Sequence, residues 1–97
     1  MARLVTTDFD LSIAEDFLKR QQLRHVCAKR RADTLTLLTG PADDPWPRAR
    51  FRIVTKQRWT VEMADRAGRW EKTPFQGSLK QLLALLVESF PWILADL

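Results

Sequence analysis

The sequence predicts a single α+β domain in which an antiparallel meander sheet of about five strands carries two helices on one face. Apolar and polar residues alternate strictly over 48–53 and again over 58–63. Because successive side chains on a strand point to opposite faces, each run has one apolar and one polar side. Near each end of the chain, capping-box pairs precede apolar residues at helical spacing. We therefore expect residues 1–97 to form one domain.

The composition is that of a globular intracellular chain. Of the 97 residues, 45% are hydrophobic and 29% are charged, which argues against disorder. The single cysteine, Cys27, excludes an internal disulfide and favours a reducing cytosol. The first ten residues lack the apolar core of a signal peptide, and the longest apolar run, 82–87, is far shorter than the about 20 residues that span a membrane. We expect a cytoplasmic protein with no membrane partner.

The first helix is expected over residues 13–22. Ser12 and Glu15 have the spacing of a capping box, in which each side chain bonds a free backbone N–H at the helix start. Apolar residues one turn apart then form a narrow stripe. Residues 23–30 follow, and their alternation and their Val and Cys favour a strand. A continuation of the helix through this segment remains the alternative.

The later strands of the sheet are expected at 34–39, 48–55, 58–64 and 69–72. In the segment 34–39, leucine alternates with threonine. Residues 40–47 contain three prolines and a glycine, and they predict a loop because proline lacks the N–H that a strand donates. Asp65 and Gly68 are the residues that a tight turn needs at its start and at its positive-φ position.

The second helix is expected over residues 79–90, after the segment 73–77 ends the sheet. Ser78 and Gln81 form another capping box, leucines follow on a wide apolar face, and Pro91 stops the helix. We expect this helix to cover the apolar face of the sheet. That face is expected to consist of Leu35, Leu37, Phe51, Ile53, Trp59, Val61 and Trp70.

The positive charge of the chain is concentrated in its middle. Between Lys19 and Lys72 there are fourteen basic and six acidic residues, whereas the two flanks together have two basic and six acidic residues. The net charge of +4 therefore belongs to the predicted sheet, and the ends of the chain are acidic. Such an asymmetry is typical of proteins with an anionic partner.

Arginines on the polar side of the sheet are the candidate nucleic-acid or anion-binding residues: Arg48, Arg50, Arg52 and Arg58. The first three share a strand face at about 7 Å spacing, close to the spacing of phosphates along a nucleic-acid strand, and guanidinium groups bind phosphate bidentately. A face that is only solvated, or ion-paired to Glu62, is the alternative. Stacking of bases would also need exposed aromatic rings, whereas Trp59 and Trp70 are expected in the core.

A protein interface is the other candidate site, and its residues are Trp46, Trp92, Ile93 and Leu94. Tryptophan is enriched where interfaces derive most of their energy, and exposed apolar patches mark contacts. A homodimer through the C-terminal helix and the tail after it would use the surplus apolar surface of that helix. In the alternative, Trp46 folds over the sheet edge and the tail covers the core.

Catalytic and metal-binding signatures are weak. His25 and Cys27 fall on one predicted strand face, but an activated thiolate also needs an orienting group. Asp43 and Asp44 are adjacent acids in a proline-rich loop, where solvated turn residues are the simpler interpretation. The sequence has no phosphate-binding glycine motif and no spaced zinc ligands. We therefore predict no catalytic residue, no metal site and no cofactor.

A series of short motifs runs between Leu23 and Trp92. It comprises Arg24 with the strand after it, TLTL at 34–37, DDPW at 43–46, ARFR at 49–52, Trp59, DRAGRW at 65–70, SLKQLL at 78–83 and Trp92. This order resembles that of the DUF3024 proteins, an uncharacterised bacterial family. The chain departs from the family in lacking tyrosine and in ending Phe90-Pro91-Trp92 where the family tends to have Trp-Gly. The resemblance implies a similar fold, and it implies no site because the family has no established activity.

These observations predict a small non-enzymatic binding module. Its expected action is through protein contacts or homodimerisation. Nucleic-acid binding through the arginine-rich sheet face is the alternative.

Overall fold

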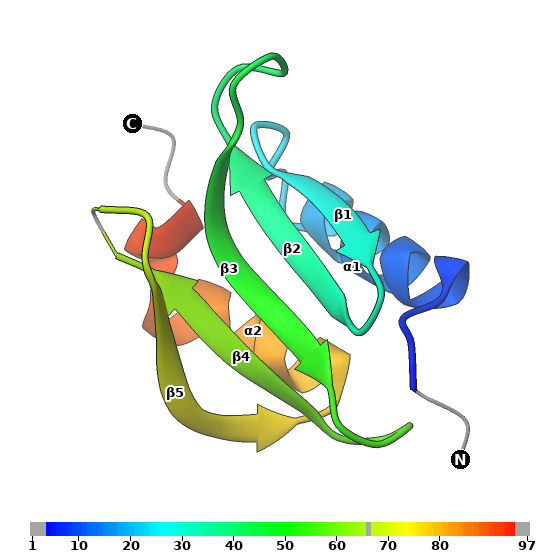
Figure 1. Ribbon diagram of the computed structural model, residues 1–97. Coiled ribbons are helices and arrows are strands. Elements are labelled where there is room, and N and C mark those ends of the chain that lie inside the picture. Colours follow the sequence, from blue (N-terminus) through cyan, green and yellow to red (C-terminus); the bar gives the residue numbers. More distant parts are fainter. Residues whose placement is uncertain (1–3, 66, 95–97) are drawn as a thin grey trace.

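A computed structural model describes residues 4–65 and 67–94. In chain order, one α-helix precedes a five-stranded sheet and another follows it (Figure 1). The elements are α1 (Asp8–Arg20), β1 (Cys27–Arg31), β2 (Thr34–Thr39), β3 (Trp46–Ile53), β4 (Trp59–Ala64), β5 (Trp70–Gly77), α2 (Leu79–Ser89) and the 3-10 helix η1 (Pro91–Leu94). The predicted α+β class is confirmed: one antiparallel sheet, with one helix before its strands in the sequence and one after them.

The sheet is a meander in which strand order follows chain order, β1-β2-β3-β4-β5, and every neighbouring pair is antiparallel. Both helices lie on the same side of this sheet, behind it in Figure 1. No helix formed by residues 4–65 or 67–94 lies on the opposite side. We call this side the open face.

The core lies between the sheet and the helices. Alternate residues of β2, β3 and β4 are buried, as the period of two predicts, and Leu18 of α1 and Leu86 of α2 pack among them. α2 carries apolar residues on nearly all sides, and these are covered by α1 on one side and by the sheet on another. The buried hydrophobic residues are Ala14, Leu18, Val26, Leu35, Leu37, Ala49, Phe51, Trp59, Val61, Leu79, Leu82, Leu83, Leu86 and Leu94.

The first helix begins earlier than the sequence predicted. Thr7 is its N-cap, and the capping box joins Thr7 to Asp10, not Ser12 to Glu15. Ser12 lies inside the helix, where its hydroxyl donates to the carbonyl of Asp8. The prediction of a helix over 13–22 therefore started five residues too late.

The segment predicted as a strand over 23–30 divides into two parts. Residues 21–26 form turns after the helix, with Gln22 at a φ of +59°, and the strand β1 begins only at Cys27. Helix α1 does not continue into it. The alternation over 23–30 thus predicted the second half of the segment and was wrong for the first half.

Two prolines lie inside strands, contrary to the prediction. Pro47 belongs to β3, next to an irregularity in the pairing with β2. Pro74 belongs to β5, which is an edge strand and extends to Gly77 instead of ending at residue 72. Opposite Val61 the register shifts, and the Thr73 hydroxyl donates to the Val61 carbonyl over 2.8 Å. A side chain thus bonds the Val61 carbonyl where the backbone pairing is irregular, next to Pro74, which has no N–H.

The turn between β4 and β5 is confirmed. The Asp65 carboxylate accepts the N–H groups of Ala67 and Arg69 at 2.8 and 2.9 Å, and Gly68 adopts a φ of +81°. These backbone bonds, the one from Arg69 first, hold the pKa of Asp65 below its usual value despite some desolvation. Arg66, also part of the predicted turn, lies outside the described residues.

Neither helix in the described ranges has the length and apolar character that a membrane-crossing segment needs.

Candidate functional site

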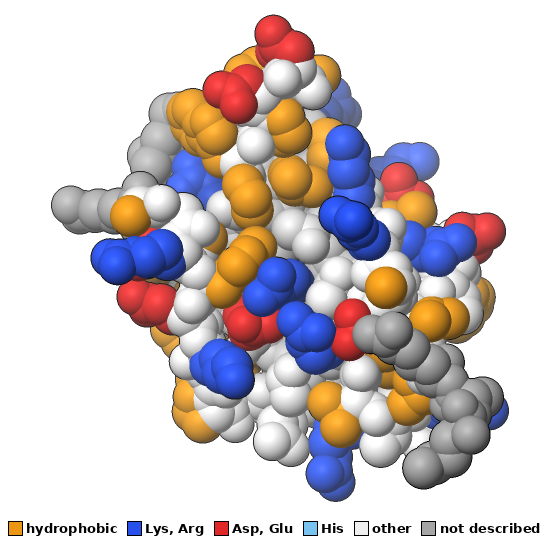
Figure 2. All heavy atoms as spheres, viewed as in Figure 1, with side chains coloured by type: hydrophobic (Ala, Val, Ile, Leu, Met, Phe, Trp, Pro, Cys, Tyr) orange, Lys and Arg blue, Asp and Glu red, His pale blue; other side chains and the backbone are white. Residues whose placement is uncertain are grey.

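The open face carries a row of five polar side chains that crosses all five strands, and four of them are charged. Lys29 of β1 lies opposite Thr36, Thr36 opposite Arg50, Arg50 opposite Glu62, and Glu62 opposite Lys72 of β5. Thr36 and Arg50 alternate with buried residues, and directly paired residues share one face of a sheet, so the whole row points away from the helices. Figure 2 shows basic side chains gathered around acidic atoms in the middle of this face.

Glu62 binds two arginines at the centre of the row. Its carboxylate accepts Nε and Nη2 of Arg50 at 3.2 and 3.1 Å, and it lies 3.5 Å from Nη2 of Arg52. Arg52 also donates to Asp33 over 3.0 Å. The Glu62 residue is only 9% exposed. Burial alone would raise the pKa of Glu62, but the bonds and charges of the two arginines outweigh it and hold this pKa below its usual value.

Trp70 does not belong to the core, and its expected place there was wrong. It pairs with Ala64 of β4, which is on the same side of the sheet as Glu62. The guanidinium carbon of Arg50 lies 4.4 Å from the centroid of the Trp70 ring, in cation–π contact. Arg50 is therefore held by Glu62 on one side and by an aromatic ring on another.

The three arginines of β3 do not form the row of free groups that their spacing predicted. Arg48 lies at the irregularity in the β2–β3 pairing, where its Nε donates to the Thr39 hydroxyl over 2.8 Å. Its guanidinium carbon also lies 5.8 Å from the ring centroid of Trp46. Arg50 and Arg52 instead bind carboxylates. Arg58 is exposed and precedes β4 instead of lying within it.

The open face thus combines three chemical features that suit an anionic, aromatic ligand: exposed cations toward its edges, a fixed guanidinium and an aromatic ring at its centre. Lys29, Arg31 and Lys72 are exposed cations toward its two edges. Arg50 over Trp70 offers a flat cationic surface at its centre. Protein side chains of this kind bind phosphates through charge and bases through stacking.

The predicted interface residues lie in different environments. Trp46 is 49% exposed beside Arg48, and Trp92 is 61% exposed with its ring edge against Phe90. Ile93 is half-buried. Leu94 is only 3% exposed and packs in the core, as the alternative interpretation of the tail expected. The rest of the apolar tail, residues 95–97, lies outside the described residues.

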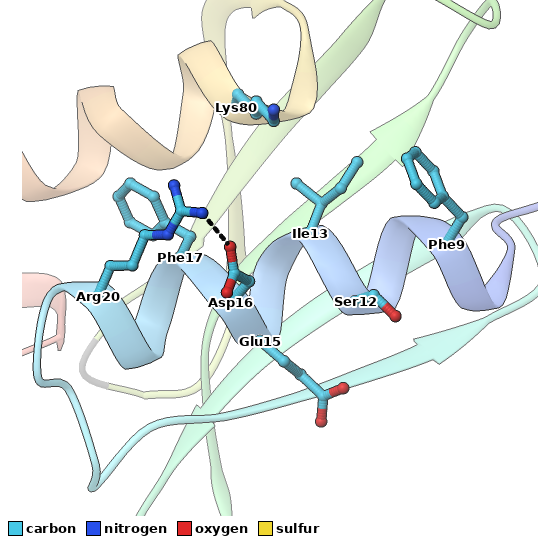
Figure 3. A pocket seen from close by; sticks show the side chains of 8 residues that line it. All are labelled: Phe9, Ser12, Ile13, Glu15, Asp16, Phe17, Arg20 and Lys80. Atoms are coloured by element: carbon cyan, nitrogen blue, oxygen red, sulfur yellow. Dashed lines mark ion pairs between the residues drawn. The ribbon is translucent and has the colours of Figure 1, made fainter.

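A groove along α1 was not predicted from the sequence. Phe9, Ile13 and Phe17, four residues apart, point to one side of the helix, toward Lys80 at the start of α2 (Figure 3). The groove has a volume of about 700 Å³, and Phe9 is 73% exposed. The sequence signal was present in the i, i+4, i+8 spacing, but it was missed because the predicted helix began after Phe9.

The weak catalytic and metal candidates remain separate features. The ring Nε2 of His25 lies within hydrogen-bonding distance of the Leu94 carbonyl, which ties the end of the chain to the segment before β1. Cys27 is exposed and unbridged. Asp43 and Asp44 are exposed in the β2–β3 loop. Within 4–65 and 67–94, no three His, Cys, Asp or Glu residues are grouped as a metal ion would require.

Comparisons with protein-family models, with curated proteins and with solved structures gave no match. The resemblance to the DUF3024 proteins stays a prediction from the sequence motifs.

Proposed function

We propose that this protein binds single-stranded nucleic acid on the open face of its sheet, without sequence preference and without catalysis. The observation that carries this proposal is the contact of Arg50 with Trp70 on a sheet face that no helix covers. A cytoplasmic location, supported by the single unbridged Cys27, suits such a ligand.

The phosphates of the bound nucleic acid would interact with the cations toward the edges of the open face. Lys29 and Arg31 on β1 and Lys72 on β5 are exposed. Neutralising phosphates releases counterions from the nucleic acid and gives an affinity that falls with salt. This part of the binding is independent of sequence.

The bases would stack on the Arg50–Trp70 pair. Guanidinium planes and aromatic rings are both stacking partners for unpaired bases, and each stacked base contributes about 1–3 kcal/mol. Glu62 holds the Arg50 guanidinium over the ring through two bonds. Because stacking requires a base that is free of a duplex, the proposed ligand is single-stranded.

Fluorescence anisotropy with a labelled oligo-dT tests this proposal. We expect saturable binding at low salt with an affinity that falls steeply as salt rises. Lys29→Gln combined with Lys72→Gln should weaken it about tenfold or more, since each phosphate contact is a charge-assisted bond. Trp70→Leu should weaken it by a comparable factor while leaving most of the salt dependence in place.

The matched control is Lys19→Gln combined with Arg24→Gln. This variant removes the same charge from exposed positions outside the sheet, at the end of α1 and in the turn after it. It should bind almost as well as the unaltered protein. Absence of binding at low salt, or an equal loss in both double variants, contradicts the proposal.

A second candidate function is homodimerisation through the groove along α1. The apolar side chains of Phe9, Ile13 and Phe17 form the groove together with a mixed-charge rim. The rim includes the acids Glu15 and Asp16 and the bases Arg20 and Lys80. A surface with equal numbers of both signs is complementary to a copy of itself, because a two-fold axis can set acids opposite bases.

Light scattering tests the dimer. The unaltered protein should show a mass of twice 11.3 kDa at micromolar concentration, and Phe9→Glu should return it to the monomer. Val54→Glu introduces the same charge at an exposed apolar residue beyond β3 and should leave the mass unchanged. A monomer at all micromolar concentrations removes this candidate.

A further inference from the structure

A hollow of about 250 Å³ opens in the sheet where β5 departs from regular pairing with β4. Thr60 pairs with Gln76 and Glu62 pairs with Lys72, so three residues of β5 face the single residue Val61. This extra length bends β5, as its curved ribbon in Figure 1 shows. The hollow is lined by Arg52, Thr60, Val61, Glu62, Lys72 and Thr73.

The lining of the hollow offers hydrogen-bond donors. The Lys72 ammonium is exposed, and among the described residues it forms no ion pair. The Thr60 hydroxyl has no hydrogen-bond partner among the same residues. Arg52 has a side chain 40% exposed despite its two carboxylate contacts, so part of its guanidinium still faces outward.

The charge around the hollow is positive. Glu62 is its one acidic lining residue, and Arg50 and Arg52 both bind that carboxylate. Arg52 also bonds Asp33, so with Lys72 three cations face two acids, and one positive charge is left in surplus. An anion that enters would meet a positive surplus together with directed N–H and O–H groups, which is how proteins hold phosphate.

We propose that this hollow is a phosphate subsite that takes one phosphodiester group of a single strand bound on the open face. The inference rests on the proposed function. Trp70 and Lys72 are two residues apart on the same side of β5, a separation of about 7 Å. A base stacked at the Arg50–Trp70 pair therefore leaves its neighbouring phosphate within reach of Lys72, which lines the hollow together with Thr60.

The oligo-dT titration tests the subsite with single substitutions. Lys72→Gln should lower the affinity about tenfold, and the slope of log affinity against log salt should fall by about 0.7, the value for one contact to a single strand. Lys29→Gln removes the same charge from the other end of the cross-strand row and should cost several times less affinity. Thr60→Val should weaken binding without changing the slope.

The outcomes separate the subsite from the function. If the oligonucleotide binds but Lys72→Gln and Lys29→Gln lose affinity equally, the subsite is wrong and binding by the open face stands. If the unaltered protein does not bind the oligonucleotide, the proposed function and the subsite both fail.

Inorganic phosphate gives a readout of the hollow itself. In NMR spectra of the folded protein, phosphate should produce saturating shifts of the Thr60, Lys72 and Thr73 amides, which Lys72→Gln abolishes. A linear drift equal to that in chloride of the same ionic strength overturns the subsite.

Discussion

Glu62 is the residue that organises the open face. It is nearly buried, yet it is charged, and it bonds Arg50 while lying 3.5 Å from Arg52. A carboxylate in this position is stable only because its oxygens have cationic partners. The same bonds fix the Arg50 guanidinium over Trp70. One acid in an otherwise basic region therefore determines where the central cations lie.

Replacing this carboxylate should change both the stability and its pH dependence. The pKa of Glu62 in the folded protein lies below the usual value of 4.5. Its stabilisation is therefore complete above the unfolded pKa and is lost as the pH falls from about 4.5 through the folded pKa. We expect Glu62→Gln to lower the free energy of unfolding at pH 7 by about 1–3 kcal/mol and to flatten its decline in acid.

Urea unfolding at pH 7 and at intervals down to pH 3 measures this effect. Glu71→Gln is the control, because Glu71 is exposed on β5 and forms no ion pair among the described residues. It should change neither the stability nor the slope. If the free energy of unfolding declines in acid as steeply in Glu62→Gln as in the unaltered protein, Glu62 is not the group that causes this decline.

The sequence predicted the partners of Glu62 but not the position of Trp70. Alternation along 48–53 and 58–63 is enough to place Arg50, Arg52 and Glu62 on one side. The side on which Trp70 lies depends on the number of residues in the turn before it, because a shift of one residue reverses the faces of a strand. The turn residues 65–69 place Trp70 opposite Ala64. No periodicity within the short β5 segment contains that information.

At the level of elements, helix α1 shows why the boundaries were harder to predict than the element types. Ser12–Glu15 matches the capping-box pattern with Glu at its last position, whereas Thr7–Asp10 has Asp there, so local sequence favours the later box. The tertiary structure selects the earlier one. Thr6, just before the N-cap, bonds the Ala32 carbonyl through both its N–H and its hydroxyl. This anchor to the β1–β2 turn fixes the chain where the earlier box begins.

Two alanine substitutions distinguish the boxes. Thr7→Ala removes the side chain that accepts the Asp10 N–H, and it should cost about 1 kcal/mol. Ser12→Ala lies inside the helix, where alanine is the better helix former, and it should be neutral or slightly stabilising. Thermal unfolding followed by circular dichroism compares the two. A larger loss in Ser12→Ala than in Thr7→Ala would contradict the observed helix start.

The sheet was predicted best where no proline intervenes. Strand β2 was predicted to the residue, because threonine and leucine alternate over 34–37 and the glycine and prolines that follow Thr39 mark its end. Strand β5 was predicted too short, because Pro74 was interpreted as its end. Proline is tolerated here because β5 is an edge strand with irregular pairing to β4, and the Thr73 hydroxyl bonds the Val61 carbonyl at that irregularity. A hydrogen bond that a side chain makes in place of the backbone does not change the alternation of apolar and polar residues, so periodicity does not predict it.

Removing that hydroxyl should weaken the edge of the sheet. Thr73→Val leaves the Val61 carbonyl without this donor, and we expect a loss of about 1–2 kcal/mol. Thr36→Val is the control, because Thr36 is a β2 residue whose hydroxyl has no hydrogen bond within the part of the chain described. Chemical denaturation of both variants measures the difference. Equal stability would show that water replaces the Thr73 hydroxyl at no cost.

At the scale of the whole molecule, stability depends on the layer between the sheet and the helices. The apolar side of the alternating segments predicted most of this layer, including Phe51, Trp59 and Val61. It could not predict the contribution of Leu94, which reaches the core through the 3-10 turn after α2. Such a contact depends on how the chain continues past Pro91, which local pattern does not specify.

Phe51 lies at the centre of this layer and is fully buried. Phe51→Ala removes its apolar contacts and leaves a cavity, so we expect a loss of about 3–5 kcal/mol in the free energy of unfolding. Val54→Ala is the control at an exposed apolar residue outside the proposed dimer groove and should change the stability by less than about 1 kcal/mol. Similar losses in the two variants would contradict the location of the core.

The meander also has a kinetic consequence. Each strand pairs with its neighbour along the chain, and the longest connection between paired strands is the six residues 40–45. The entropy lost on closing such short loops is small, and topologies dominated by nearby contacts fold quickly. The contact between α1 and α2 is different, because these helices precede and follow the whole sheet in the sequence. The nascent chain can therefore form most of its hairpins during synthesis, whereas the docking of α1 on α2 must wait until α2 has left the ribosome.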